Sequence, residues 1–374
     1  MKKNTGSYNY LFVAASLAFF VSGFTALGYQ VLWQRILSQE IGVDSISVAI
    51  IVSIFMLGLG IGTYIGKSLA STSRIPVTIY AIAEIMIAIF AFFSPEFLRL
   101  EQAAQLINHS YIASAIVYGT ILLIPTALMG IGVPLIVAAC SRDDSNISFV
   151  FGFLYGLNIL GAFAGTIIAS FFAIELLGLD ISLKAFALVN VFVPIIAFPF
   201  ILKELRDSDG LPRFSFIWLT RGSKVRMRKN WVIAILVYGF ATLSLEILFF
   251  RYLSNYFGSV SIVFPLLLAA YLLNMSIGEM LGGFLSKFWI KRSLITIVLT
   301  LIGLTLLIGF LSITEKWLID IGVTRSLAKN PKDYFDLFGI LILFLTPVLF
   351  FSALLPLFMN SIESQDGLKK DVVG

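Results

Sequence analysis

The sequence contains very few of the residues that usually build catalytic or metal centres. It has one cysteine, Cys140, and one histidine, His109, among 374 residues. A single cysteine excludes an intrachain disulfide and a thiolate metal cluster, and a single histidine argues against a histidine-based metal site. No spacing of residues supports a nucleophile–base pair. We therefore expect no metal ion, no cofactor and no catalytic residue, and an enzyme is the least favoured class.

Charged residues are also scarce, and long apolar runs take their place. Lys, Arg, Asp and Glu make up 13% of the chain, against about 25% in soluble domains, and the mean hydropathy is +0.98. Continuous apolar runs of about 18 residues or more indicate membrane-spanning helices, whereas a β-barrel shows alternating segments of about ten residues. The sequence predicts an all-α, polytopic transmembrane helical bundle in the lipid bilayer. Its ten predicted spans are 10–35, 46–68, 76–94, 111–140, 147–173, 182–202, 231–252, 260–285, 293–313 and 335–362.

The basic residues predict how these spans are oriented. With the N-terminus in the cytoplasm, 18 of the 26 Lys and Arg residues fall on the cytoplasmic side, as the positive-inside rule requires. An even number of spans then places the C-terminus in the cytoplasm too. The first residues contain no small-residue cleavage site, so we interpret them as a retained start rather than a signal peptide. We expect a multi-pass protein of the cell (inner) membrane, and we attribute the net charge of +5 to this topology, not to nucleic-acid binding.

One stretch of the chain occurs twice. Residues 23–70 align without a gap with residues 239–286, and 15 of the 48 aligned positions are identical. Six predicted spans separate the two starts, so both copies enter the membrane from the same side. This parallel orientation is the one that relates the two halves of major-facilitator transporters.

Small and helix-breaking residues recur at matching spacings in both halves of the chain. Glycines every four residues remove side chains from one helix face, so that two backbones can approach closely. A proline inside a span frees a backbone carbonyl and favours a kink. We expect these residues to serve helix packing, with a hinge or sliding surface as the alternative. They are Gly58, Gly62, Gly66, Pro125, Pro134, Gly278, Gly282, Pro347 and Pro356.

The repeat divides the chain into three parts. Residues 1–202 form the first membrane repeat with about six spans, and residues 231–374 form a second, shortened repeat with about four. The pair of spans absent from the second repeat is supplied by another subunit, lost, or present in a longer natural chain. Residues 203–230 form a basic cytoplasmic linker. This linker either lies on the anionic inner leaflet or docks a soluble partner.

A few polar side chains inside the predicted spans form the candidate substrate site. A carboxylate in hydrocarbon costs about 2.5–3.5 kcal/mol on insertion scales, and such groups usually face a cavity or a partner. Three acids and no lysine lie well inside the spans, away from their ends, so a cationic solute could neutralise them. The structural alternative is a set of hydrogen bonds between helices. The hypothetical substrate-binding residues are Gln30, Glu84, Asn158, Glu246 and Glu279.

Several segments together resemble one family. The segments are SGFTALGYQVLWQRILSQEIGVDSISV, MLGLGIGTYIGK, IAEIM, IPTALMGIGVPL and FLYGLNILGAFAG, and they are similar to the membrane portion of the fused major-facilitator/spermidine-synthase-like proteins. The resemblance implies a membrane module associated with polyamine-like or methyltransferase-like chemistry. In many relatives a soluble synthase domain follows the last span. Here only twelve residues follow it, so we do not carry aminopropyltransferase activity over to this chain.

Two functions remain open from the sequence. The first is a transporter-like protein that handles a small, cationic, polyamine-like solute. The second is a membrane scaffold or subunit. Its partner would be a separately encoded cytoplasmic enzyme, similar to spermidine synthase or to a methyltransferase, or a second membrane subunit. The embedded acids favour the first, and the basic linker with the absent soluble domain favours the second.

Overall fold

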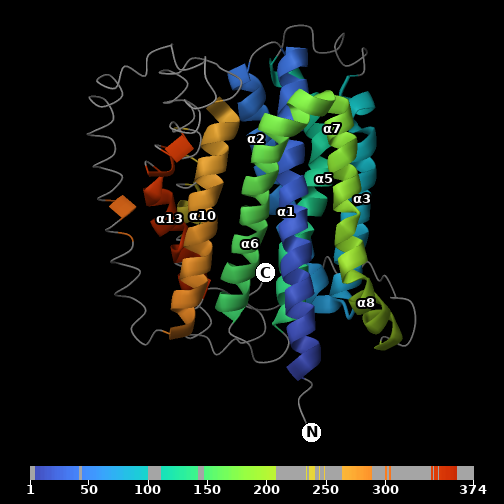
Figure 1. Cartoon of the computed structure of the whole chain (residues 1–374), viewed down its shortest axis with the longest axis vertical. Helices are drawn as coiled ribbons and strands as arrows, with labels where there is room; N and C mark the ends of the chain where they lie inside the picture. Colours follow the sequence, from blue (N-terminus) through green and yellow to red (C-terminus); the bar gives the residue numbers. More distant parts are fainter. Residues whose placement is uncertain are drawn as a thin grey trace.

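The computed structural model is a bundle of long α-helices that run side by side (Figure 1). It describes residues 5–41, 44–99, 111–141, 147–207, 263–288 and 345–359, with shorter stretches between 233 and 248 and between 300 and 343. No β-strand occurs in these ranges. The elements are α1 (Thr5–Ile41), α2 (Asp44–Thr72), α3 (Pro76–Leu98), α5 (Tyr111–Cys140), α6 (Ile147–Ile168), the π-helical turn η1 (Ala169–Ala173), α7 (Ile174–Asn190), α8 (Phe192–Asp207), α10 (Val263–Phe288) and α13 (Thr346–Ser352).

The length and composition of these helices identify a membrane protein. Seven helical stretches in the described part are long and apolar enough to cross a bilayer. Large apolar side chains also point outwards along them, where a soluble protein would place polar groups. On α3 these exposed residues are Ile82, Ile85, Met86, Ile89 and Phe93.

One of the seven stretches crosses the bundle twice. It runs over 60 residues, Ile147–Arg206, which corresponds to about 90 Å of helix, three times the hydrocarbon thickness. The chain reverses at Gly178, whose backbone has φ 74° and ψ 176°. Glycine is the residue that adopts this conformation without strain. α6 and α7 therefore run in opposite directions, and both contact α1.

The helices of the first half agree with the predicted spans. Each of the six segments predicted within residues 10–202 overlaps a described helix, because apolar length and breaks at polar residues are local properties of the sequence. In the second half, α10 coincides with the predicted span 260–285. Most of the predicted spans 231–252 and 293–313 lie outside the described residues. The count of ten spans therefore stays a prediction.

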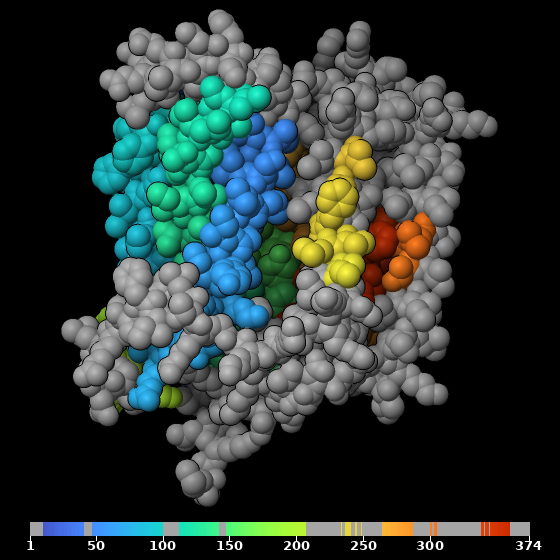
Figure 2. All heavy atoms as spheres, turned by 180° about the vertical axis from the view of Figure 1, so that it is seen from behind, coloured from blue at the N-terminus to red at the C-terminus, as the bar shows by residue number. Residues whose placement is uncertain are grey.

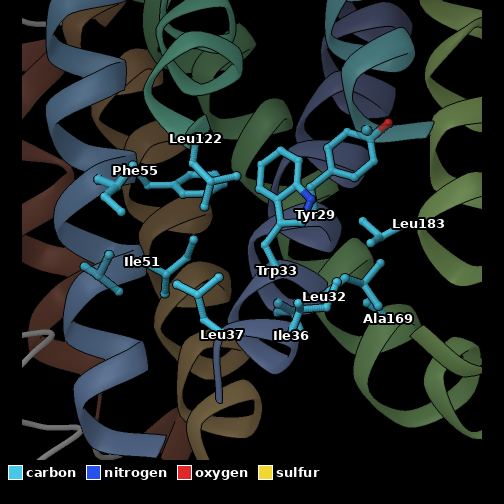
Figure 3. Packing of buried hydrophobic residues seen from close by; sticks show 14 of the residues in the cluster. Tyr29, Leu32, Trp33, Ile36, Leu37, Ile51, Phe55, Leu122, Ala169 and Leu183 are labelled. Carbon is cyan, nitrogen blue, oxygen red and sulfur yellow. The ribbon is translucent and has the colours of Figure 1, made fainter. Parts of the chain in front are cut away.

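The core of the first half is centred on aromatic residues of α1 (Figure 3). Tyr29 and Trp33 are fully buried and stack with their ring centroids 5.4 Å apart. The Trp33 indole donates a hydrogen bond of 2.9 Å to the hydroxyl of Ser94, so its polar atom is satisfied inside the bundle. Figure 3 shows this pair between Phe55 on one side and Leu183 on the other. α1 is thereby held in the middle of the first half.

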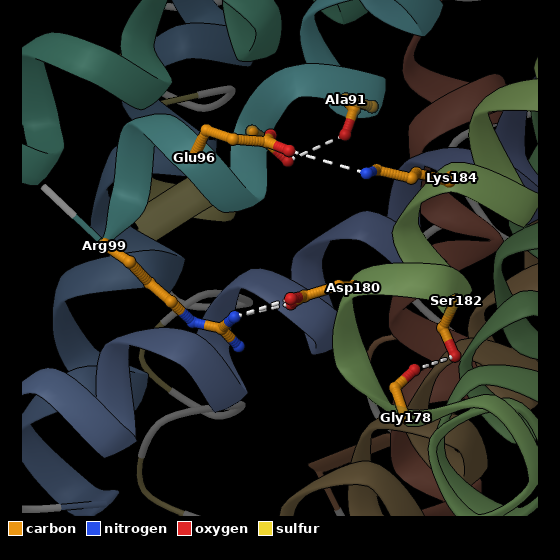
Figure 4. A network of polar contacts seen from close by, with 8 residues as sticks. Ala91, Glu96, Arg99, Gly178, Asp180, Ser182 and Lys184 are labelled. Atoms are coloured by element: carbon orange, nitrogen blue, oxygen red, sulfur yellow. Dashed lines mark hydrogen bonds and ion pairs between the residues drawn. The ribbon is translucent and has the colours of Figure 1, made fainter.

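Polar contacts join α3 to α7 at one end and to α8 at the other. At one end Arg99 pairs with Asp180 at 2.7 Å, and Lys184 lies 3.4 Å from Glu96 (Figure 4). At the other end the Glu204 carboxylate of α8 accepts hydrogen bonds from backbone groups at the start of α3. An acid at a helix N-terminus satisfies free N–H groups and complements the helix dipole.

The prolines affect the two halves differently. α5 runs as one helix from Tyr111 to Cys140 with Pro125 and Pro134 inside it. The corresponding part of the second half is interrupted, because α13 begins with Pro347 in its first turn and ends at Ser352, and the helix resumes at Leu354. The helix therefore stays continuous at the prolines of the first half and is interrupted near those of the second half.

Candidate functional site

Glu279 of α10 is the most unusual polar residue of the described chain. Its side chain has 0% exposure, and neither carboxylate oxygen has a hydrogen-bond partner among the described residues. Buried charged groups in proteins are normally paired and hydrogen-bonded. An acid without either kind of partner marks a site whose function is not explained by packing alone.

The close approach of α6 and α10 creates this burial. A Cβ atom on Gly152 would lie 2.7 Å from the carbonyl oxygen of Glu279, which is closer than real side chains allow. One turn further along α6, the Ser276 hydroxyl donates a hydrogen bond of 2.7 Å to the carbonyl oxygen of Gly156. Small residues at this spacing let the two helix backbones touch. Water is excluded from the side of Glu279 that faces α6.

Two tyrosines lie in the neighbourhood of this acid. Tyr155 of α6 and Tyr238 lie close enough to interact electrostatically with Glu279. The Tyr238 hydroxyl donates a hydrogen bond of 3.0 Å to the carbonyl oxygen of Phe351, which fixes its ring against the helical segments after residue 345. Tyr271, two turns before the acid on α10, is 5% exposed and also interacts electrostatically with Tyr238. The site therefore combines one carboxyl group with the rings of Tyr155 and Tyr238.

This combination suits a cation. A carboxylate gains most from a positive partner when the pair is shielded from water, and a cation is attracted to the face of a tyrosine ring within about 6 Å. Tyr155 lies one residue before Gly156, next to the close contact between α6 and α10. The acid and Tyr155 thus lie where a helix of the first half meets a helix of the second half.

Glu84 of α3 lies in a different environment. Its Oε1 accepts a hydrogen bond of 2.6 Å from the Ser22 hydroxyl of α1. The Asn190 amide of α7 donates to the Glu84 backbone carbonyl at 2.9 Å, and Thr25 donates to Asn190 at 2.5 Å. Tyr80 also interacts electrostatically with this acid. Glu84 thus belongs to a hydrogen-bonded network that joins three helices of the first half.

Of the remaining predicted substrate residues, the structure describes Gln30 and Asn158, and no described hydrogen bond joins them to either acid. Gln30 is 2% exposed in α1, and no hydrogen bond joins it to a described acid. The Asn158 amide donates to the carbonyl oxygen of Phe19 at 2.8 Å and so links α6 to α1. Glu246 lies outside the described residues. The contacts of Glu84 are on α1, α3 and α7, and those of Glu279 are on α6, α10 and residue 238, so the structure separates the two acids.

The glycines of the repeat lie where two helices touch. In the first half, Gly58, Gly62 and Gly66 face α5 so closely that an added Cβ would collide with it; at Gly66 it would lie 2.7 Å from the carbonyl oxygen of Ile131. In the second half, Gly278 and Gly282 face α13 and Ala353 in the same way. Both helices approach their neighbours through glycine.

The two sets of glycines also use the same register. Gly62 faces the carbonyl oxygen of Ala127, and Gly278 faces that of Leu349. The glycines are 216 positions apart and their partners 222. Gly66 with Ile131 and Gly282 with Ala353 repeat both intervals. The interval of 222 is also the one between Pro125 and Pro347.

The tyrosines near Glu279 were missed by sequence reasoning. Tyrosine is common at membrane interfaces, so its presence in an apolar span does not by itself indicate a binding site. Tyr155 had a local signal, because it is flanked by Gly156 and Asn158 in a helix face rich in small residues. Tyr271 and Tyr238 had none, since only the packing of distant helices brings them towards Glu279.

Other chemistry has little support in the described chain. No group of three or more His, Cys, Asp or Glu residues is arranged there to hold a metal ion. Cys140 is buried at the end of α5. Comparison with protein-family models and with curated proteins gives no match for this chain. The expectation of a chain without metal and cofactor stays a prediction.

Proposed function

We propose that this chain is an integral membrane, transporter-like protein that binds a small cationic solute at Glu279. One observation carries the proposal: a fully buried carboxyl group, at the contact between α6 and α10, has no hydrogen-bond partner in the described chain. Breaking up a buried ion pair costs about 3–5 kcal/mol, because a charge is left without compensation. A permanent structural role would favour a partner within the protein. A solute that arrives and leaves accounts for the absence of one.

The proposed solute class is an organic ammonium ion, and a polyamine-like compound is the form we favour. Tyrosine rings near the acid suit a cation that also carries apolar surface, because the ring faces attract charge while the rings bury methylene groups. The resemblance to the family with a spermidine-synthase-like domain points to the same class of compound. Inorganic cations normally bind several oxygen ligands, and the described site offers one carboxyl group.

The proposed architecture consists of two parallel repeats, with six spans in residues 1–202 and four in residues 231–374, as in major-facilitator-like bundles. Its support is the equal register of the glycine contacts described above. Figure 2 shows a hollow between α2, in blue, and the described residues from 233 to 248, in yellow, with α6 at its floor. A hollow between the halves that reaches α6 is consistent with access to a site on this helix. We place the protein in the inner membrane with both termini in the cytoplasm.

The scaffold function remains a separate prediction. It depends on the basic linker 203–230, and residues 208–230 lie outside the described part of the chain. No described contact favours it over transport.

Transport in liposomes tests the proposed function. The purified chain is reconstituted, and uptake of labelled putrescine and spermidine is measured under an imposed ion gradient. We expect uptake by the wild-type protein and at least a tenfold loss in Glu279→Gln. The matched control is Glu96→Gln, because Glu96 is an exposed acid whose ion pair with Lys184 lies at a helix end. Equal uptake by Glu279→Gln and wild type, or no uptake of either amine, would contradict the proposal.

A further inference from the structure

We propose that Glu279 holds a proton whenever the site holds no cation, and that each cation that binds releases this proton. The protein would then exchange protons for organic cations. This inference rests on the proposed cation site and adds the mechanism that couples the site to a proton gradient.

The environment of the carboxyl group supports the protonated form. An ionised carboxylate needs hydrogen-bond donors or a positive charge when it is removed from water. Glu279 has 0% exposure and no donor within hydrogen-bond distance of either oxygen in the described chain. A neutral carboxyl group avoids the cost of burying a charge. Glu84 provides the contrast, because the Ser22 hydroxyl donates to its carboxylate at 2.6 Å.

The described groups near Glu279 do not supply a compensating charge. Tyr155 on α6 and Tyr238 are the titratable residues described near it, and Tyr271 of α10 lies close to Tyr238. α6 contains no Lys or Arg, and neither does α13. On its own helix the nearest basic residue is Lys287, eight residues away, which corresponds to about 12 Å along the axis. Within the described helices α6, α10 and α13, a cation that enters the site is therefore the first positive charge within reach of the acid.

The exchange balances in atoms and charge. An alkylammonium ion enters the site, the O–H bond of the Glu279 carboxyl group breaks, and the proton leaves to water. The resulting carboxylate and the ammonium group form an ion pair, and no other bond is made. Each monovalent ammonium ion that enters is matched by one proton that leaves, because the site holds one carboxyl group. A proton gradient across the membrane would consequently drive the cation in the opposite direction.

Proton release on binding tests this inference. The full chain in detergent is titrated with putrescine and with propylammonium chloride in weakly buffered solution, and a pH-indicator dye records the protons released. We expect about one proton per bound propylammonium ion, and an affinity that rises about tenfold for each pH unit within the exchange range. Infrared difference spectra of the wild-type protein should show loss of the protonated carboxyl band when the amine binds.

Two variants separate the possible outcomes. Glu279→Gln should release no proton and show no amine-dependent infrared band, and Glu96→Gln, a change at an exposed acid, should release as many protons as the wild type. Saturable, Glu279-dependent binding without proton release, or with an affinity independent of pH, would overturn the exchange and leave the cation site intact. Absence of any saturable amine binding by the wild type would overturn both. The wild-type infrared measurement decides the outcome even if Glu279→Gln does not fold.

Discussion

Gly152 of α6 lies directly against the backbone of Glu279 in α10, so that a Cβ atom on the glycine would be 2.7 Å from the carbonyl oxygen of the acid. The contact joins a helix of the first half to a helix of the second at the level of the candidate site. It explains how an acid in the middle of an apolar span is removed from water, because no side chain on α6 holds the two backbones apart.

The first prediction concerns this contact. Replacing Gly152 by leucine should force α6 and α10 apart and lower the free energy of unfolding by about 1–3 kcal/mol, the usual cost of overpacking. Thermal unfolding in detergent, followed by tryptophan fluorescence, measures the change. Gly60→Ala is the matched control, since a Cβ on Gly60 of α2 would meet no atom within 4 Å. Equal stability of Gly152→Leu and the control would contradict the close contact.

The second prediction tests whether the two halves pack alike. Alanine at Gly62 would collide with the Ala127 carbonyl, and alanine at Gly278 with the Leu349 carbonyl. Both substitutions should therefore destabilise the protein, each by roughly 1–3 kcal/mol. Thermal unfolding of the two variants in the same detergent measures the loss of stability. A large loss of stability in one variant and none in the other would show that the two glycine contacts, although they share a register, do not contribute alike to stability.

The third prediction concerns the network around Glu84. Ser22→Ala removes the 2.6 Å hydrogen bond to Oε1 and leaves that buried oxygen without its donor. Because an unsatisfied buried polar group costs about 1–3 kcal/mol, we expect a loss of that size. In Glu84→Gln the same serine substitution should cost less, since the charged acceptor is gone. A double-mutant cycle with denaturant unfolding measures the coupling, and additive effects would show that the two side chains do not interact.

The fourth prediction concerns the start of α3. The Glu204 carboxylate accepts hydrogen bonds from the backbone N–H groups of Val77 and Thr78 at 3.1 and 2.9 Å. Loss of a helix cap costs about 0.5–2 kcal/mol, so Glu204→Ala should lower the melting temperature. Arg206→Ala, an exposed neighbour in the last turn of α8, should leave it nearly unchanged. Hydrogen exchange should also be faster at Val77 and Thr78 in Glu204→Ala alone; protection equal to that of the wild type would argue against the cap.

Much of the helical architecture follows from local sequence. Apolar runs of sufficient length predicted the helices of the first half, and the glycine spacing predicted which helix faces approach one another. These predictions succeed because hydrophobic length and the absence of a side chain act within a single helix. The ends were less predictable: α1 begins at Thr5 and ends at Ile41, beyond the predicted limits of 10 and 35, because helical hydrogen bonding continues past the apolar run.

The candidate site was only partly predictable. Glu279 and Glu84 both stood out as acids within apolar spans, and the sequence did not distinguish their surroundings. The distinction depends on neighbours that are far away in the chain. Ser22 lies 62 positions from Glu84 and donates to it, whereas Gly152 and Tyr155 lie more than a hundred positions from Glu279. Such pairs depend on which helix faces meet, and the sequence of one helix does not indicate which other helix packs against it.

The sequence alone therefore determined that this protein is a helical membrane protein with an internal repeat. Polar groups are costly in hydrocarbon, so each membrane-spanning helix has to be a long apolar run that can be recognised in the sequence. It also identified the small set of polar residues inside those spans. The tertiary structure decided which of them are satisfied. It gives Glu84 a donor from α1 and leaves Glu279 buried without one, because the burial and hydrogen bonding of a side chain are set by the packing of helices that are distant in sequence.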